Sequence, residues 1–213
     1  MQTFDAIRTR RAVKHFDPAH RLTAAEEQTL FELALTAPSA FNLQHGRLVK
    51  VDDPALRQSI REVAWNQAQV TDASLLLVLT ADLASWRKHA GRIWQEAPGP
   101  VQDFMTGAID AYYRDKPLVQ RDETMRSGGI LAQTLMLAAR AMGYDSCPMD
   151  GFDFDAVARL VNLPDDHVIV MMVAIGKALE PARPRIGMAP LVLSGSASGT
   201  PRAAAAFGAD ICI

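Results

Sequence analysis

Four cationic side chains lie within seven residues near the start of the chain, in the segment 8–14, which reads R-T-R-R-A-V-K. Several guanidinium and ammonium donors held together in water-poor surroundings can bind a dianionic group such as a phosphate monoester. The same residues also suit a solvated basic turn at the C-terminal end of a helix. Both interpretations stay open for this segment taken alone.

Two polar segments could hydrogen-bond the edge of a flat heterocycle. Residues 37–45 read A-P-S-A-F-N-L-Q-H, with short polar side chains where a helix ends, although Pro, Ser and Asn are also ordinary turn residues. Residues 66–69 read N-Q-A-Q, and we expect Asn66 and Gln69, three positions apart, on one face of a helix end. Exposed amides are common at helix ends, so this pattern also fits a surface role.

Two further segments, nearer the C-terminus, could present backbone or cationic donors. Residues 147–152 read C-P-M-D-G-F, which predicts a tight turn with exposed backbone N–H groups. Arg183 and Arg185 flank Pro184 in an extended segment. Either segment alone is equally typical of a surface turn.

Several motifs of other enzyme classes are absent from the sequence. It contains no G-x-G-x-x-G after a strand, no Walker A loop and no H-E-x-x-H, and its five histidines never stand four positions apart. We therefore expect no metal site. Residues 85–88 match S-x-x-K, but the companion motifs of that class are missing, so we expect no hydrolase.

The elements that must position these segments follow from hydrophobic spacing, caps and breakers. Helices outnumber strands without regular alternation, so we predict an α+β fold. Helices are predicted over 3–10, from 24 to the proline at 38, over 54–69, around Trp86 and Trp94, across 101–112, over 122–142 and over 155–162. Strands are predicted over 47–51, 75–79 and 168–175, with a strand and turn over 144–152.

Length and charge limit the classes of protein to which the chain can belong. With 213 residues we expect a single domain over 1–213, of which 187–213 form an extended tail. The net charge of −2 does not favour nucleic acid, and the longest apolar run, residues 168–175, is too short to span a membrane. No signal peptide is visible, so we expect a cytoplasmic protein.

The order of the polar segments along the chain resembles the FMN-dependent nitroreductase family, and the resemblance runs from about residue 3 to residue 186. The segments that carry it are Arg10-Arg11-x-x-Lys14, Pro38-Ser39-x-x-Asn42-x-Gln44, Asn66-x-x-Gln69, Pro148-x-x-Gly151 and Arg183-x-Arg185. The resemblance implies an interlocked homodimer with two FMN sites at its interface, built on a central, mainly antiparallel sheet surrounded by helices.

The resemblance also implies which residues hold the cofactor. Arg10 and Arg185, assisted by Arg11 and Arg183, would bind the FMN phosphate. Lys14 and Gln69 would face the N1/C2=O edge of the isoalloxazine ring, and Asn66 the ribityl chain or the pyrimidine edge. The partner subunit would contribute Pro38, Ser39 and Asn42, with Gln44 beside them. The segment Pro148, Met149, Asp150 and Gly151 would pass one face of the ring, with a backbone N–H near N5.

The activity implied by the resemblance is an NAD(P)H-dependent FMN oxidoreductase that reduces nitroaromatic, quinone or similar flat acceptors by hydride transfer through FMN. NADH or NADPH would be the donor. Lys14 would stabilise the charge of the reduced flavin, and no dedicated acid or base is needed. Phe41, Phe104 and Tyr112 are candidate walls of the substrate pocket. The alternatives are a specialised reductase of one enal, semialdehyde or haloaromatic metabolite, and a flavin storage or sensor protein.

Three features, at four positions, depart from the pattern of the family. Ala12 stands where many members have serine, and Gln69 stands where some have lysine. His45 and Gly46 replace a Pro-Trp pair. Cys147 adjoins the turn at 148–151, and we assign it no role.

Overall fold

The structure is a computed structural model of the chain and describes residues 1–187. Residues 1–182 form one compact unit, and residues 183–187 belong to a second. Residues 183–187 carry no helix or strand. All but the first residue of the predicted tail lies outside the described residues, so the single domain over 1–213 stays a prediction.

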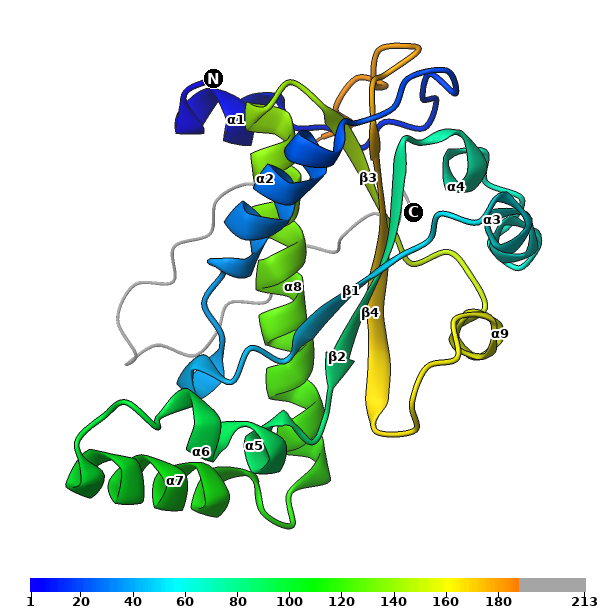
Figure 1. The fold of residues 1–213 in the computed structure, drawn as a ribbon. Helices are drawn as coiled ribbons and strands as arrows, with labels where there is room; N and C mark the ends of the chain where they lie inside the picture. The colour runs from blue at the N-terminus through cyan, green and yellow to red at the C-terminus, as the bar shows by residue number, and fades with distance from the viewer. Residues whose placement is uncertain (188–213) are drawn as a thin grey trace, which may run out of the picture. The chain divides into compact units, whose positions relative to one another are not determined.

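A four-stranded antiparallel sheet forms the centre of the first unit (Figure 1). Its strands are β1 (Gly46–Lys50), β2 (Leu75–Asp82), β3 (Asp145–Met149) and β4 (His167–Gly176), in the order β1-β2-β4-β3. The predicted α+β fold with an antiparallel sheet is confirmed. β1 and β3 are therefore the two edge strands, and a parallel bridge between Ala12 and Ser146 places the N-terminal segment against β3.

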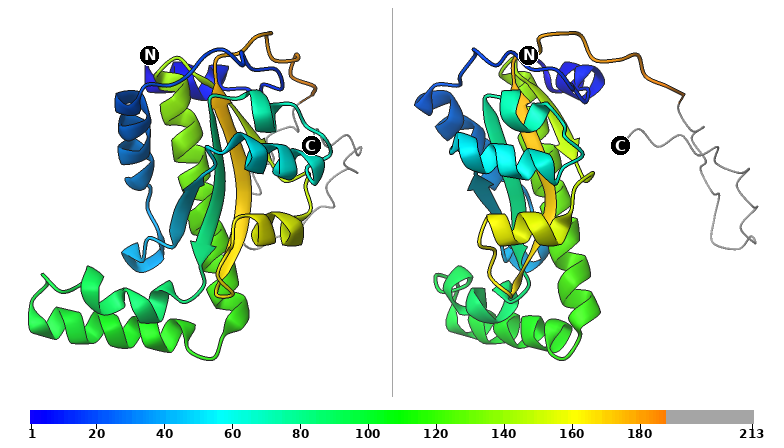
Figure 2. Two further views of the ribbon diagram at one scale, coloured as in Figure 1. Left: turned by 45° about the vertical axis from the view of Figure 1, so that its right-hand side comes forward. Right: turned by 90° about the vertical axis from the view of Figure 1, so that its right-hand side faces the viewer.

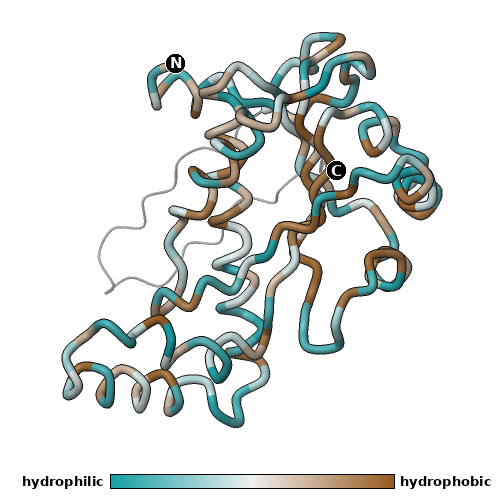
Figure 3. Tube along the Cα trace, viewed as in Figure 1, coloured by the Kyte–Doolittle hydropathy of each residue, from teal (hydrophilic) through white to brown (hydrophobic). Residues whose placement is uncertain are grey.

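The pleat of β2 separates two hydrophobic layers, because successive side chains of a strand point to opposite faces. Leu76 and Val78 pack with α3 (Pro54–Glu62) and α9 (Phe154–Leu160). Leu75, Leu77, Leu79 and Ala81 pack with α2 (Ala24–Leu35) and α8 (Pro117–Ala141). Figure 2 shows these helix pairs on opposite faces of the sheet, and Figure 3 shows hydrophobic residues along its central strands. Both faces of the sheet are covered, which explains why residues 75–79 of β2 are apolar without interruption.

The remaining helices are shorter or lie beside the sheet. They are α1 (Thr3–Thr9), η1 (Ala40–Asn42), α4 (Gln69–Asp72), α5 (Ser85–Lys88), α6 (Ala90–Ile93) and α7 (Gly99–Tyr113). The single helix predicted around Trp86 and Trp94 is wrong, since α5 and α6 divide there. Both indoles pack against one hydrophobic cluster that includes Leu43, Ile109 and Tyr113, as core residues would. Among the described residues, no helix combines the length and apolar character needed to cross a membrane.

Caps and prolines set the boundaries of the larger helices. The Thr23 side chain accepts a hydrogen bond from the backbone N–H of Glu26, and the Glu26 carboxylate accepts one from the Thr23 N–H, which completes the expected capping box of α2. α8 begins at Pro117 rather than 122, because proline suits the first helical turn, where its missing N–H has no partner to lose. Its end before Gly143, which has a φ of +85°, is as predicted.

The continuous helix predicted over 54–69 is wrong. α3 ends at Glu62, and the chain then passes through Trp65 and Asn66, whose φ angles of 51° and 52° lie in the left-handed region. Left-handed residues of this kind cannot continue a right-handed helix. Gln69 consequently opens a separate helix, α4, and Asn66 and Gln69 do not share one helical face.

Candidate functional site

The basic segment after α1 lies beside the start of β3. Arg140, near the end of α8, donates to Thr9 Oγ1 at 3.0 Å and to Asp145 Oδ1 at 2.7 Å, which ties the end of α1 to β3. The Val13 N–H donates to the Ser146 carbonyl at 3.1 Å. These bonds hold Lys14, the next residue along the chain, next to the middle of β3.

The Cys147 sulfur lies next to two predicted cofactor residues, Lys14 and Gln69. Cys147 is fully buried. Its sulfur receives a hydrogen bond from Gln69 Nε2 at 3.9 Å, and the Lys14 side chain lies close enough to lower the pKa of the thiol. Arg10 lies close enough to act on the thiol electrostatically. Burial raises the pKa of Cys147 against the opposing effect of these groups, so the residue stays a neutral thiol at neutral pH. The site joins residues that are far apart in sequence.

Gln69 is connected to the turn at 148–151 through Gln67. Its side chain is almost completely buried, and its Nε2 donates to Gln67 Oε1 at 2.8 Å. Gln67 Nε2 in turn donates to the Gly151 carbonyl at 3.0 Å. The predicted turn and the predicted amide therefore belong to one hydrogen-bonded group.

Trp65 packs against this turn, and the next residue, Asn66, is held by Arg61. Arg61 Nε donates to Asn66 Oδ1 at 2.9 Å, and the Arg61 guanidinium also reaches Thr71 Oγ1 at 2.8 Å. The Trp65 side chain is 67% exposed, yet a Cβ added to Gly151 would lie only 2.7 Å from its ring. An exposed indole thus packs directly against the backbone of the turn.

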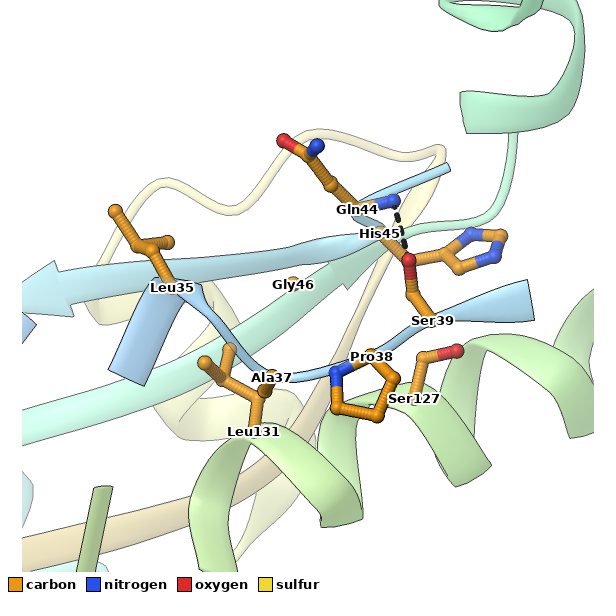
Figure 4. Close-up of a pocket in the computed structure, with 9 residues that line it drawn as sticks. All are labelled: Leu35, Ala37, Pro38, Ser39, Gln44, His45, Gly46, Ser127 and Leu131. Carbon is orange, nitrogen blue, oxygen red and sulfur yellow. Dashed lines mark hydrogen bonds between the residues drawn. The ribbon is translucent and has the colours of Figure 1, made fainter. Parts of the chain in front are cut away.

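The loop 38–44 holds an unusual backbone. Phe41, Asn42 and Gln44 have φ angles of 52°, 56° and 49°, a left-handed conformation that non-glycine residues adopt rarely. The Gln44 N–H donates to Ser39 Oγ at 2.8 Å, which closes the loop over a small pocket (Figure 4). Ala37, Ser127 and Leu131 contribute to the lining of this pocket. Strain of this kind often accompanies a functional loop.

The structure separates the predicted cofactor residues into two groups. The loop 38–44 leads into β1, at one edge of the sheet, whereas Lys14 and the turn at 148–151 adjoin β3, at the other (Figure 1). Three strand spacings of about 4.8 Å place the two edges about 14 Å apart. One protomer does not bring both groups to the same place.

An open cleft of about 460 Å³ adjoins the turn at 148–151, a volume within the range of small-molecule sites. Burial raises the pKa of the Asp150 carboxyl, which lies in its wall. The lining residues are Arg121, Met125, Gly129, Asp150, Phe154, Ile169, Val170 and Met171. α8 can approach β4 closely here because Gly128 has no side chain. A Cβ added to Gly128 would lie only 2.5 Å from Val170.

Two of the three predicted pocket aromatics lie together. The rings of Phe41 and Tyr112 are 5.5 Å apart, and Tyr112 donates to Glu123 Oε1 at 3.1 Å. Phe104 lies eight residues earlier on α7, about 12 Å along the helix, and is 71% exposed. The structure therefore groups Phe41 with Tyr112 and leaves Phe104 apart.

Arg183 and Arg185 belong to the second unit, so their part in a phosphate site stays a prediction. Gln67 and Trp65 are the residues that sequence reasoning missed. Gln67 stands inside the N-Q-A-Q segment, but only its contact with Gly151, 84 residues away, distinguishes it from an ordinary surface amide.

Asp82, Asp166 and His167 bring three possible metal ligands within 4.8 Å of one another, away from this site. Lys88 Nζ already lies 2.9 Å from Asp82 and 2.7 Å from Asp166. The Lys88 ammonium group thus supplies the positive charge between these two carboxylates. The two ion pairs tie α5 to the end of β2 and to the residue just before β4.

Comparison with known proteins identifies the family of the chain. The sequence model of the Nitroreductase family matches residues 7–177. Protein DrgA of Synechocystis sp. is 57% identical over 182 residues, which are 85% of this chain and 87% of DrgA. MhqN of Bacillus subtilis, provisionally named an NAD(P)H nitroreductase, is 34% identical over 186 residues, which are 84% of this chain and 90% of MhqN.

The fold also matches solved structures. A provisionally named nitroreductase from Exiguobacterium sibiricum, solved in complex with FMN, superposes with a TM-score of 0.81 at 26% sequence identity. The match covers 89% of this chain and 94% of that one. Since the family model matches most of its length and the fold superposes on a member of known structure, this chain belongs to the nitroreductase family.

Proposed function

We propose that the protein is an NAD(P)H-dependent FMN oxidoreductase that reduces flat electrophilic acceptors such as nitroaromatics and quinones. The observation that carries the proposal is the meeting of Lys14 and Gln69 at Cys147, beside the turn at 148–151. The relatives add support, since one is named for NAD(P)H and one was solved with FMN.

The donor set suits FMN. Lys14 is a cation next to an amide group, and Arg10 and Arg11 stand a few residues away at the end of α1. A flavin mononucleotide needs a cationic site for its phosphate and hydrogen-bonding groups for its polar ring edge. We assign the phosphate to Arg10, Arg11, Arg183 and Arg185, and the ring to Lys14, Asn66, Gln69 and the segment Pro148, Met149, Asp150 and Gly151.

FMN supplies the two-electron chemistry when bound, and the protein supplies binding and electrostatics. Lys14 holds a positive charge beside the position of the ring, and a preorganised charge in a dry site favours the form that carries more negative charge. The neutral Cys147 thiol adds no opposing charge. The reduction of the acceptor requires no general acid from the protein, because water can provide the proton.

We further propose that the protein acts as a homodimer. The loop 38–44 and the turn at 148–151 lie at opposite edges of the sheet, so one chain cannot place both against one ring. A twofold axis would bring the loop of one protomer to the turn of its partner and would create two equivalent sites. Phe41 and Tyr112, which lie together on the loop side, would then wall the substrate position.

The visible spectrum of the purified protein tests the proposal. Yellow protein with flavin absorption that bleaches rapidly on anaerobic addition of NADH or NADPH is the expected result. Protein that stays colourless after incubation with excess FMN contradicts the function. Flavin that binds but is not reduced by either nicotinamide identifies a storage or sensor protein instead, and reoxidation by a single acceptor class identifies a specialised reductase.

A further inference from the structure

The hydrogen bonds around Gln67 fix the direction of the Gln69 amide. The Gly151 carbonyl can only accept, so the group of Gln67 that faces it at 3.0 Å is the amide nitrogen. Gln67 therefore turns its Oε1 toward Gln69. An oxygen that has no proton can only accept, so the atom of Gln69 that lies 2.8 Å away is Nε2.

The second proton of the Gln69 amide also has a partner. Cys147 Sγ lies 3.9 Å from Gln69 Nε2, and the thiol itself has the Pro148 carbonyl at 3.5 Å as its acceptor. An amide nitrogen carries two protons, and Gln67 and Cys147 take both. Gln69 can therefore offer a ligand only its carbonyl oxygen.

Asn66 has the opposite polarity. Its Oδ1 accepts from Arg61 Nε at 2.9 Å, and an arginine can only donate. The amide nitrogen of Asn66 is then the group that remains for a ligand. Together the two side chains offer one donor and one acceptor, which complement an edge that carries both C=O and N–H groups.

We propose that Gln67 and Cys147 are positioning residues that fix Gln69 so that its Oε1 accepts a hydrogen bond from N3–H of the FMN ring. The proposal rests on the proposed function. An oxidised isoalloxazine carries a single ring N–H, at N3, so an obligate acceptor has one partner on that ring. The family resemblance alone places Gln69 at the N1/C2=O edge of the ring. That edge offers only hydrogen-bond acceptors, with which the Gln69 carbonyl oxygen cannot pair.

A purely structural role is the alternative for both residues. Gln67 would then serve to close the turn at Gly151, and Cys147 would serve as a small core residue. In that case their loss would weaken the binding of every flavin to the same extent. A positioning role instead predicts that their loss reduces the preference for flavins that have the N3 proton over flavins that lack it. This preference arises because Gln69 Oε1 stays unpaired when the N3 proton is absent.

The test compares binding of FMN and of 3-methyl-FMN by fluorescence quenching, in the full chain and in variants. We expect the wild-type protein to bind FMN at least about tenfold more tightly than 3-methyl-FMN. In Gln67→Leu this ratio should fall to about twofold, because the amide of Gln69 is free to turn. The matched control is Gln58→Leu, whose amide contacts only Glu62 on the surface of α3 and whose ratio should match the wild type. Cys147→Ala should lower the ratio less than Gln67→Leu, and Cys147→Ser, which keeps an acceptor, should restore it.

A measurement without flavin keeps the proposal testable if Gln67→Leu does not fold. In flavin-free wild-type protein the two side-chain amide protons of Gln69, assigned by NMR through their loss in Gln69→Glu, should exchange slowly with solvent. Rapid exchange overturns the proposal. Equal affinity of the wild type for both flavins, or equal weakening of both in Gln67→Leu, also overturns it. Binding of neither flavin by the wild type overturns the proposed function instead.

Discussion

Gly151 and Trp65 are in contact so close that a single methyl group cannot be added between them. A Cβ on Gly151 would lie 2.7 Å from Trp65 Cζ3, and Gly151 itself has an ordinary backbone conformation. The contact, not backbone freedom, is therefore what requires glycine here. It joins the turn at 148–151 to the left-handed residues that precede α4.

Gly151→Ala should destabilise the protein by about 1–3 kcal/mol, as overpacking commonly does. The exposed indole should move toward solvent, with a red shift in tryptophan fluorescence. Urea unfolding of Gly151→Ala, Trp65→Ala and the double variant measures the coupling between the two positions. In the double variant most of the loss should disappear. Additive losses would place the effect elsewhere in the turn.

Arg57 is a buried guanidinium that serves only backbone carbonyls. It donates to Val51 at 2.7 Å, to Ala73 at 2.6 Å and to Ser74 at 3.2 Å, and so fixes the end of α4 and the start of β2. Arg57→Leu leaves these acceptors unpaired and should lower the free energy of unfolding by about 3 kcal/mol. Urea denaturation measures this loss. Arg159→Leu, at an exposed position of α9, should change it by less than about 0.5 kcal/mol, and equal losses in the two variants would refute the role of Arg57.

The capping box of α2 makes stability depend on pH. The Tyr144 hydroxyl, which donates to Glu26 at 2.6 Å, and the Thr23 backbone and hydroxyl lower the pKa of Glu26 from 4.5 to about 2. A group whose pKa is lowered by folding stabilises the folded state above its unfolded pKa. This contribution should be complete above pH 4.5 and should disappear as the pH falls toward about 2.

Urea midpoints measured through this pH range check the prediction. Glu26→Gln should remove this part of the acid sensitivity and should lower stability near neutral pH, and Tyr144→Phe should do so in part. Glu32→Gln, in the same helix, is the control and should keep the wild-type pH profile. A Glu26→Gln profile that parallels the wild type would contradict the assignment.

The parts of the fold that depend on local chemistry could be predicted from the sequence. The capping box at Thr23 indicated the start of α2, and the apolar residues 75–79 indicated the central strand. Both features depend only on residues that are close together in the sequence. The break after Glu62 could not be predicted, since Trp65 and Asn66 adopt a left-handed backbone without the glycine that usually indicates one. The start of α8 at Pro117 was missed because the polar residues 120–124 separate Leu118 and Val119 from the apolar residues further along the helix.

The site was predictable as a set of segments but not as a geometry. The order of Lys14, Gln69 and Gly151 along the chain carried the resemblance, whereas the direction of each amide depends on partners far away in sequence. The acceptor of Gln67 lies 84 residues away in the sequence, and Ala12 pairs with Ser146, which is also far away along the chain. No local pattern records such contacts. The separation of the loop 38–44 from β3 likewise appears only once the strand order is known.

That separation leads to a prediction about hybrid dimers. Lys14→Met affects the β3 edge, and Asn42→Trp affects the exposed loop at the β1 edge. If each site combines the β3 edge of one protomer with the loop of its partner, each variant alone has two damaged sites. A hybrid of the two has one site with both changes and one with neither.

Hybrids purified through two different affinity tags should show about half the wild-type amplitude of rapid flavin reduction by NAD(P)H. Sites built from a single chain would each carry one change in the hybrid, and its amplitude would stay at the level of the parent variants. Sedimentation of both variants as dimers is the control, because it establishes that the loss lies in the sites and not in assembly.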